Sequence, residues 1–349
     1  MPSPSVARVT TEDAELTGAS TWTDPGWRDA ALAWAVDRLA EHGRTPSGRP
    51  AQVHVRPWST VIRIQVDGGD VWLKSVGTGS AHEPALAEAL GRWVPERVLV
   101  PPAVEPARRL LLLPDGGVTL RGTGGGRLVE AWEAMLAGYA RMQIALAGHA
   151  DDLVAIGVPD YRPLRLPGLV RALLEDDDAM LELPGGIDPA VRERLLDAMG
   201  DYAELCAALT AGPVPMSLQH DDLHDANVFV VGNGHRFFDW GDASVGHPFQ
   251  SLMVPLRMAT AALDLPRGHP VMLRLRDAYL QPWRPFAETR VLHELVDSAL
   301  QVTPLERSLT WRRILLGIHP DERADWQASV PGWAAETMEP GPLAGVPGI

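Results

Sequence analysis

Apolar and polar residues alternate along several short stretches in the first third of the chain. Such alternation is typical of strands in a sheet that buries one face. It is clearest at 60–66 and 71–76, where the polar, glycine-containing residues 67–70 between them indicate a hairpin turn. We therefore predict a small five-stranded antiparallel sheet with strands at 52–57, 60–66, 71–76, 98–104 and 109–113.

Longer segments carry apolar residues at every third or fourth position, which predicts helices. Two of them accompany the sheet, at 24–42 and 83–94, and Asp24 followed by Pro25 is a favourable start for the first. Beyond residue 127 the pattern is mainly helical. The helices predicted there cover 128–147, 164–183, 188–209, 252–263, 270–280, 286–302, 304–317 and 320–328.

This change of pattern predicts an α+β protein in two parts. Residues 1–115 are expected to form a small lobe of sheet and helix, and residues 116–349 a larger, mainly helical lobe. The first 24 residues are polar with little periodicity and are expected to be a mobile or loosely packed arm. Residues 151–162 are expected to be a loop, and about the last dozen residues, rich in Pro and Gly, to lack order.

Composition narrows the class of protein. The apolar fraction of 46% is ordinary for a globular chain of 349 residues, and no apolar run reaches the ~18–20 residues that span a bilayer. The start lacks an apolar signal region, so we expect a cytoplasmic protein. A net charge of −14 disfavours nucleic acid as a partner. We expect a monomer or a homodimer with no membrane contact.

The richest concentration of chemical groups lies at 219–248. Two polar segments flank a predicted hairpin, in which Asn233-Gly234 separates the short apolar runs 228–231 and 237–238. The hairpin brings both segments together. Carboxylates gathered in this way repel one another, so they require a cation or a chemical role.

The spacing indicates which role. The segment from His220 to Asn227 reads H-x-D-L-x-x-x-N, the form of the protein-kinase catalytic loop, and Asp239 stands where kinases carry a metal-binding aspartate. Asp222 is suited to accept a proton from a substrate hydroxyl. The oxygens of Asn227 and Asp239 are suited to hold Mg²⁺ on nucleotide phosphates.

The wording H-D-D-L-H-D-A-N-V-F and F-D-W-G-D-A-S-V-G-H-P resembles the aminoglycoside phosphotransferase family more closely than the protein kinases. The resemblance is specific over these thirty residues and looser over most of the chain. It implies a bilobal, protein-kinase-like fold with ATP in the cleft. It also implies transfer of the γ-phosphoryl group to a hydroxyl of a small molecule, with Asp222 as base and ATP and Mg²⁺ as cofactors.

Lys74 stands out because it is the only lysine beside 30 arginines. It lies in the predicted strand 71–76, where kinases place a lysine that contacts the nucleotide phosphates. Kinases pair this lysine with a glutamate on the following helix. Glu83 and Glu88 are both available, and the family pattern favours Glu83.

The resemblance also suggests residues around the nucleotide. The connection after residue 56 falls where kinases have a glycine-rich cover, but it contains no glycine. Ser59 and Thr60 are the candidates on the phosphate side, and an ordinary hairpin turn is the alternative. Leu112, Leu113 and Asp115 fall at the expected hinge, beside the base. The family builds its acceptor pocket from helices near the C-terminus. Four acidic residues there are equally good candidates, namely Glu294, Asp297, Glu306 and Asp325.

Two departures from the family pattern accompany this assignment. Asp221 replaces the usual glycine next to Asp222, and residues 250–252 lack an aspartate that the family often carries. Three alternatives stay open. One is a kinase for another antibiotic, sugar or amino alcohol, and one is a nucleotide-binding pseudokinase. The third is a metal-dependent hydrolase that uses His220 and His224, whose four-residue spacing suits a metal on a helix.

Overall fold

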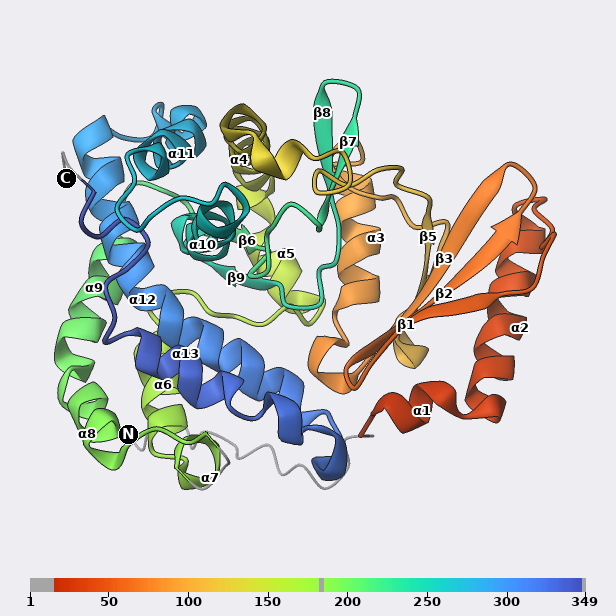
Figure 1. The fold of residues 1–349 in the computed structure, drawn as a ribbon, viewed down its shortest axis with the longest axis horizontal. Helices are drawn as coiled ribbons and strands as arrows, with labels where there is room; N and C mark the ends of the chain where they lie inside the picture. Colours follow the sequence, from red (N-terminus) through yellow and green to blue (C-terminus); the bar gives the residue numbers. More distant parts are fainter. Residues whose placement is uncertain (1–15, 182–184, 347–349) are drawn as a thin grey trace.

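The computed structural model describes residues 16–181 and 185–346, in which a smaller part with a sheet lies beside a larger, mainly helical part (Figure 1). The smaller part contains a five-stranded sheet in the order β1-β2-β3-β5-β4, with every neighbouring pair antiparallel. Its strands are β1 (Ala51–Arg56), β2 (Ser59–Val66), β3 (Gly69–Val76), β4 (Ala103–Glu105) and β5 (Leu110–Pro114). The predicted small sheet is therefore confirmed. The predicted strand at 98–104 is mostly wrong, because only its last two residues fall in β4.

Side chains alternate between the two faces of this sheet, and that alternation positions the chemistry. On one face Ile62, Leu73 and Leu112 form a core with helix α2 (Pro25–Glu41). On the other face the register aligns Val61 with Lys74 and Lys74 with Leu111. Lys74 therefore faces away from α2, on the side of the second part of the chain.

The larger part is mainly helical and lies on the other side of helix α3 (Glu83–Trp93). Its helices are α4 (Val129–Leu146), α5 (Ala150–Ala155), α6 (Leu166–Leu174), α7 (Asp177–Met180), α8 (Pro189–Asp197), α9 (Met199–Ala211), α10 (Met253–Ala262), α11 (Val271–Leu280), α12 (Thr289–Leu316) and α13 (Ser329–Glu336). None of the helices in the described ranges is long and apolar enough to cross a membrane. The division at residue 115 stays a prediction.

Four short strands in the larger part carry the polar segments. They are β6 (Ser217–Gln219), β7 (Val228–Val231), β8 (Gly234–Phe237) and β9 (Ser244–Gly246). β7 pairs with β8 as the predicted hairpin, and β6 pairs with β9. The two pairs hold the segment 220–227 and the segment 238–243 side by side.

Several helix boundaries differ from the prediction. Two of the predicted helices are each interrupted. The helix predicted at 164–183 ends before Asp176, which caps α7, and the helix predicted at 188–209 is divided at Ala198 into α8 and α9. The two helices predicted at 286–302 and 304–317 are one helix, α12 (Thr289–Leu316), that continues through Pro304. Val302 and Leu305 are buried on either side of this proline, so tertiary packing outweighs its local cost. Residues 320–328 form 3₁₀ turns, and the expected loop at 151–162 contains most of α5.

The expectations for the two ends are also partly wrong. Residues 1–15 and 347–349 lie outside the described residues. Helix α1 (Ala19–Thr23) forms within the expected arm because Trp22 is buried and its indole donates a hydrogen bond to the carbonyl of Arg56. Near the other end Leu343 and Val346 are buried.

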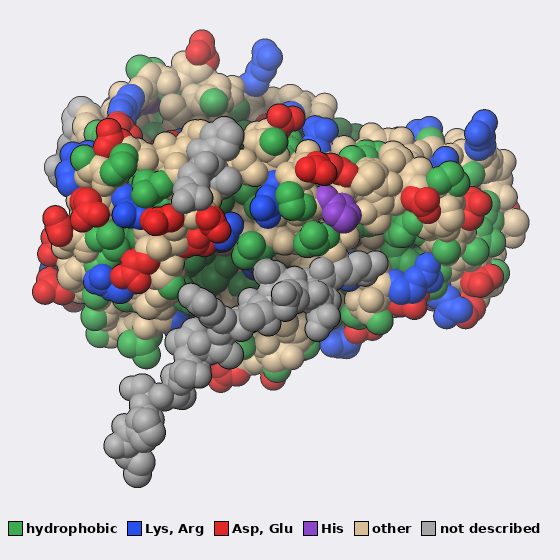
Figure 2. Space-filling view, turned by 90° about the horizontal axis from the view of Figure 1, so that it is seen from below, with side chains coloured by type: hydrophobic (Ala, Val, Ile, Leu, Met, Phe, Trp, Pro, Cys, Tyr) green, Lys and Arg blue, Asp and Glu red, His purple; other side chains and the backbone are tan. Residues whose placement is uncertain are grey.

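Charges of both signs are mixed on the surface. Figure 2 shows acidic, basic and hydrophobic side chains interspersed over the lower face, with no continuous basic area in its described part.

Candidate active site

Lys74 lies at the centre of the site. Its ammonium nitrogen is 2.6 Å from Oε1 of Glu83 and 2.6 Å from Oδ1 of Asp239. β3 supplies the lysine, the first turn of α3 supplies the glutamate, and the segment after β8 supplies the aspartate. Burial alone would lower the pKa of Lys74, but the two carboxylates raise it. The ammonium group therefore stays charged.

The structure places Glu83, and not Glu88, beside Lys74. Glu83 is buried and its Oε1 also accepts a hydrogen bond from the backbone N–H of Trp240, 3.0 Å away. Glu88 lies five residues further along α3 on a different face of the helix, is about half exposed and pairs with Arg92. Glu83 thus connects the small lobe to the segment that carries Asp239.

Asp222 lies in the segment between β6 and β7 and exposes 43% of its side chain. The Asn227 amide nitrogen donates to the Asp222 backbone carbonyl at 3.0 Å and to the carboxylate at 3.3 Å. Burial alone would raise the pKa of Asp222. A hydrogen bond from His224 and the positive charge of Arg307 instead hold this pKa below its usual range. The carboxylate is therefore ionised and held in one orientation.

His220 joins the two polar segments. Its Nε2 donates to the carbonyl of Phe238 at 2.8 Å, and its backbone N–H donates to the Tyr139 hydroxyl at 2.8 Å. The ring is fully buried against Trp240, and burial lowers its pKa. His220 therefore holds backbone in place, and its Nε2 is not available for the metal site of the hydrolase alternative.

Asp221 and Asp239 both have a positive φ, 61° and 69° respectively, in the left-handed region. Glycine adopts this conformation easily, and aspartate is among the few other residues that tolerate it. This explains why the family usually has glycine at the position of Asp221. The Asp221 side chain is buried and accepts a hydrogen bond from the Ser244 hydroxyl at 2.7 Å. It is not among the residues that line the cavity around Lys74.

A cavity of about 160 Å³ contains these groups and separates the predicted nucleotide residues into two sets. Lys74, Glu83, Ser59, Asp222 and Asp239 line it. Thr60 does not. Because neighbouring side chains on a strand point to opposite faces, the Thr60 hydroxyl faces away and donates to the carbonyl of His54 at 2.8 Å. Asn227 lies behind Asp222, outside this lining.

The predicted hinge residues also lie outside the lining. Leu112 is buried in the core against α2, and Leu113 lies on the sheet face that carries Lys74. Asp115 is exposed, and its carboxylate accepts a hydrogen bond from the backbone N–H of Gly117 at 3.0 Å. This contact forms the turn after β5.

A comparison with protein families matches residues 89–295 to the phosphotransferase enzyme family, APH. The match spans more than half of the chain and includes both polar segments. The chain belongs to this family. It is therefore a small-molecule phosphotransferase that uses ATP, as the sequence motifs predict.

Solved structures agree on the fold of this phosphotransferase. A choline/ethanolamine kinase family protein from Mesorhizobium loti has a TM-score of 0.56 at 16% identity, over 90% of this chain and 96% of the other. A macrolide 2'-phosphotransferase type I has a TM-score of 0.53 at 14% identity, over 88% and 97%. An aminoglycoside phosphotransferase in ternary complex with AMP-PNP and hygromycin B has a TM-score of 0.52 at 15% identity, over 87% and 98%. These matches confirm the predicted bilobal, kinase-like fold. No curated protein sequence matches the chain significantly.

The phosphotransferase has further residues at the site that the motifs do not indicate. Asp242 lines the same cavity, and Arg307 of α12 donates to its carboxylate at 3.1 Å. Arg313, six residues later, donates to the backbone carbonyls of Gly79, Gly241 and Asp242. Helix α12 thus holds the segment after Asp239. The only signal in the sequence is the second aspartate of D-W-G-D.

Helix α12 also carries Glu306, one of the predicted candidates for the acceptor pocket. Glu306 is fully buried, and its Oε1 accepts a hydrogen bond from the hydroxyl of Thr310 at 3.3 Å. Burial and the charge of Asp221 raise the pKa of Glu306. Glu306 is therefore a buried residue whose ionisation depends on that of Asp221, not a wall of an open acceptor pocket.

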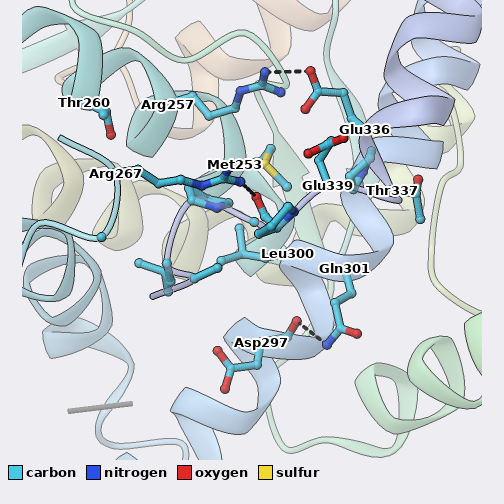
Figure 3. A pocket seen from close by; sticks show the side chains of 17 residues that line it. Met253, Arg257, Thr260, Arg267, Asp297, Leu300, Gln301, Glu336, Thr337 and Glu339 are labelled. Atoms are coloured by element: carbon cyan, nitrogen blue, oxygen red, sulfur yellow. Dashed lines mark hydrogen bonds and ion pairs between the residues drawn. The ribbon is translucent and has the colours of Figure 1, made fainter. Parts of the chain in front are cut away.

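A larger cavity of about 710 Å³ lies between α10, α12 and the C-terminal residues (Figure 3). Asp297 is the one candidate for the acceptor pocket that lines it. In Figure 3 Arg257 points to Glu336, which lies 2.9 Å away. A series of contacts joins the two cavities, because Arg257 and Arg307 both lie over the ring of Trp333, and Arg307 binds Asp242.

Proposed function

We propose that this phosphotransferase moves the γ-phosphoryl group of Mg-ATP to a hydroxyl of a small molecule, with Asp222 as the base. The observation that carries the proposal is the position of Lys74. Its ammonium group lies between Glu83 and Asp239, in a cavity that Asp222 also lines. One cation, a carboxylate for the metal and a carboxylate for the acceptor therefore meet in one place.

In this proposal Lys74 binds the nucleotide phosphates, and Glu83 holds it there. Phosphoryl transfer involves little covalent chemistry for the protein, so positioning and charge stabilisation account for most of the catalysis. Glu83 is almost fully buried and cannot move away from Lys74 without leaving a buried charge unpaired. The contact with Glu83 therefore helps to hold the Lys74 ammonium group beside Asp239.

Asp222 acts on the acceptor. As an ionised carboxylate it can accept a proton from the acceptor hydroxyl while it orients the attacking oxygen. The hydrogen bonds from the amide nitrogen of Asn227 keep it in one orientation.

Asn227 and Asp239 are suited to hold Mg²⁺. With its amide nitrogen engaged by Asp222, Asn227 has its amide oxygen to offer, and Asp239 exposes 48% of its side chain. Both are the hard oxygen ligands that Mg²⁺ prefers. Bound there, the cation supplies positive charge to the transferring phosphoryl group.

The acceptor is a small molecule with a hydroxyl group. The family resemblance favours an aminoglycoside, with other antibiotics, sugars and amino alcohols as the alternative. The test is mass spectrometry of protein incubated with Mg-ATP and a panel of these compounds. A gain of one phosphoryl group on one class supports the proposal and identifies the acceptor. Binding of Mg-ATP without transfer to any class would favour the pseudokinase, and absence of nucleotide binding would overturn the proposal.

A further inference from the structure

The connection between β1 and β2 differs from a glycine-rich phosphate cover. It consists of Pro57 and Trp58, and residues 51–66 contain no glycine. Glycine allows backbone N–H groups to approach phosphates closely because it has no Cβ. A hairpin without glycine has to contact phosphates in another way.

Side chains are placed to do so. Arg56 pairs with Ser59, and Ser59 with Val76, so these three residues form a row across the sheet. The row lies on the face that carries Lys74, and all three residues line the cavity with Asp222 and Asp239. Arg56 therefore faces the same space as the groups assigned to phosphoryl transfer.

Carboxyl groups outnumber basic side chains in the lining of the cavity, and Arg56 is one of the few basic residues there. Glu83, Asp222, Asp239 and Asp242 bring four carboxyl groups to the lining. Lys74 contacts two of them, and Arg307, which binds a third, is not in the lining. The guanidinium of Arg56 has no hydrogen bond or ion pair to any residue in the described part of the chain. It is thus a cation at the cavity that makes no direct contact with a carboxylate of the described residues.

The turn that carries this cation is fixed to the larger lobe. The indole of Trp58 packs edge-on against Trp311 of α12, with ring centroids 5.8 Å apart, and against Trp326, with centroids 4.7 Å apart. Trp326 belongs to the 3₁₀ turn η8 (Ala324–Trp326). A fixed turn loses little conformational entropy when a ligand binds, so this packing favours binding.

We propose that Arg56 binds the phosphates of the nucleotide, and that this hairpin covers them with a side chain on a fixed turn in place of a glycine-rich backbone. The inference rests on the proposed function, since it takes Mg-ATP as the ligand of the cavity. A guanidinium is well suited to the task because its planar array of N–H donors matches phosphate oxygens.

The test is isothermal titration calorimetry of the full chain with Mg-ATP, Mg-ADP and adenosine. The variants are R56Q, R56K and the control R63Q. Arg63 is an exposed arginine of β2 on the same hairpin that does not line the cavity. R56Q should weaken Mg-ATP binding about tenfold or more and leave adenosine binding unchanged, because charged hydrogen bonds to phosphate are strong. R56K should recover part of the loss, and R63Q should match the wild type.

The outcomes separate the two proposals. If the wild type does not bind Mg-ATP, the proposed function fails. If the wild type binds and R56Q binds equally well, the assignment of Arg56 fails and the proposed function stands. Equal weakening of adenosine and Mg-ATP binding by R56Q would also overturn the assignment, because it would show a general distortion of the cleft.

Discussion

The ammonium nitrogen of Lys74 lies 2.6 Å from a carboxylate oxygen of Asp239, although 165 residues separate them in the chain. One residue belongs to the sheet of the small lobe and the other to the segment that follows the β7–β8 hairpin. The contact joins the lobes across the cavity. It also means that the charge of Lys74 and the position of Asp239 depend on each other.

Replacing Lys74 should impair the use of ATP. We expect kcat/KM for ATP to fall about 100-fold or more in Lys74→Ala, the magnitude typical of losing one preorganised cation or donor. Lys74→Arg should recover little, because the planar guanidinium does not fit between two carboxylates that hold a compact ammonium group. Steady-state kinetics at varied ATP measure the effect.

The two glutamates of α3 give this prediction a matched control. Glu83→Gln should raise KM for ATP, because it removes the charge that holds Lys74, whereas Glu88→Gln should leave the kinetics unchanged. Equal kinetics of the Glu83 and Glu88 variants would contradict the role assigned to Lys74 and Glu83.

Asp222→Asn should separate chemistry from binding. The amide cannot accept the proton, so we expect kcat to fall by about 10²–10⁴, the usual contribution of a general base. Affinity for Mg-ATP should change little. Single-turnover transfer and calorimetry measure the two quantities on the same sample. A variant that keeps the wild-type kcat would exclude Asp222 as the base.

Sequence patterns predicted the parts of this site that lie within single motifs. Alternation placed Lys74 on a strand, and the spacing from His220 to Asn227 predicted the segment that lines the cavity with Asp222. The same reasoning missed Arg307 and Arg313, because their position depends on where α12 packs more than 60 residues after the hairpin. It also missed the continuity of α12, since local rules end a helix before Pro304 and cannot weigh the burial of Val302 and Leu305. The prediction of Thr60 beside the phosphates failed for a local reason, because a shift of one residue decides which face of the sheet a side chain joins.

Asp221, which replaces the usual glycine beside Asp222, should make the stability of the fold depend on pH. Burial raises the pKa of Asp221 to about 6 in the folded protein, whereas an unfolded aspartate titrates near 4. Below about pH 4 the side chain is protonated in both states. Between about pH 4 and 6 the unfolded state releases the proton and the folded state keeps it, so the folded protein loses stability as pH rises through this window.

Asp221→Asn removes this titration and keeps a residue that tolerates positive φ. The free energy of unfolding of the variant, relative to the wild type, should rise by up to about 3 kcal/mol between pH 4 and pH 6, because two pKa units correspond to roughly that energy. Urea unfolding at each pH measures it. A difference that stays constant across the window would contradict the raised pKa.

Replacing either Trp58 or Trp326, whose indoles pack against each other, should impair the use of ATP. Neither indole carries charge, and Trp326 is not among the residues that line the small cavity. Trp58→Ala and Trp326→Ala should each raise KM for ATP about threefold to tenfold, because each removes packing that fixes the turn beside Arg56, and an aromatic pair contributes about 0.5–1.5 kcal/mol. Trp58→Phe should raise KM less than Trp58→Ala, because the phenyl ring keeps part of the packing.

The control is Trp34→Ala, which removes a half-buried indole from α2, away from the cleft. All three alanine variants should lower the thermal midpoint, but only the first two should raise KM. If Trp326→Ala lowers the midpoint and leaves KM unchanged, the indoles stabilise the fold without fixing the turn that covers the nucleotide.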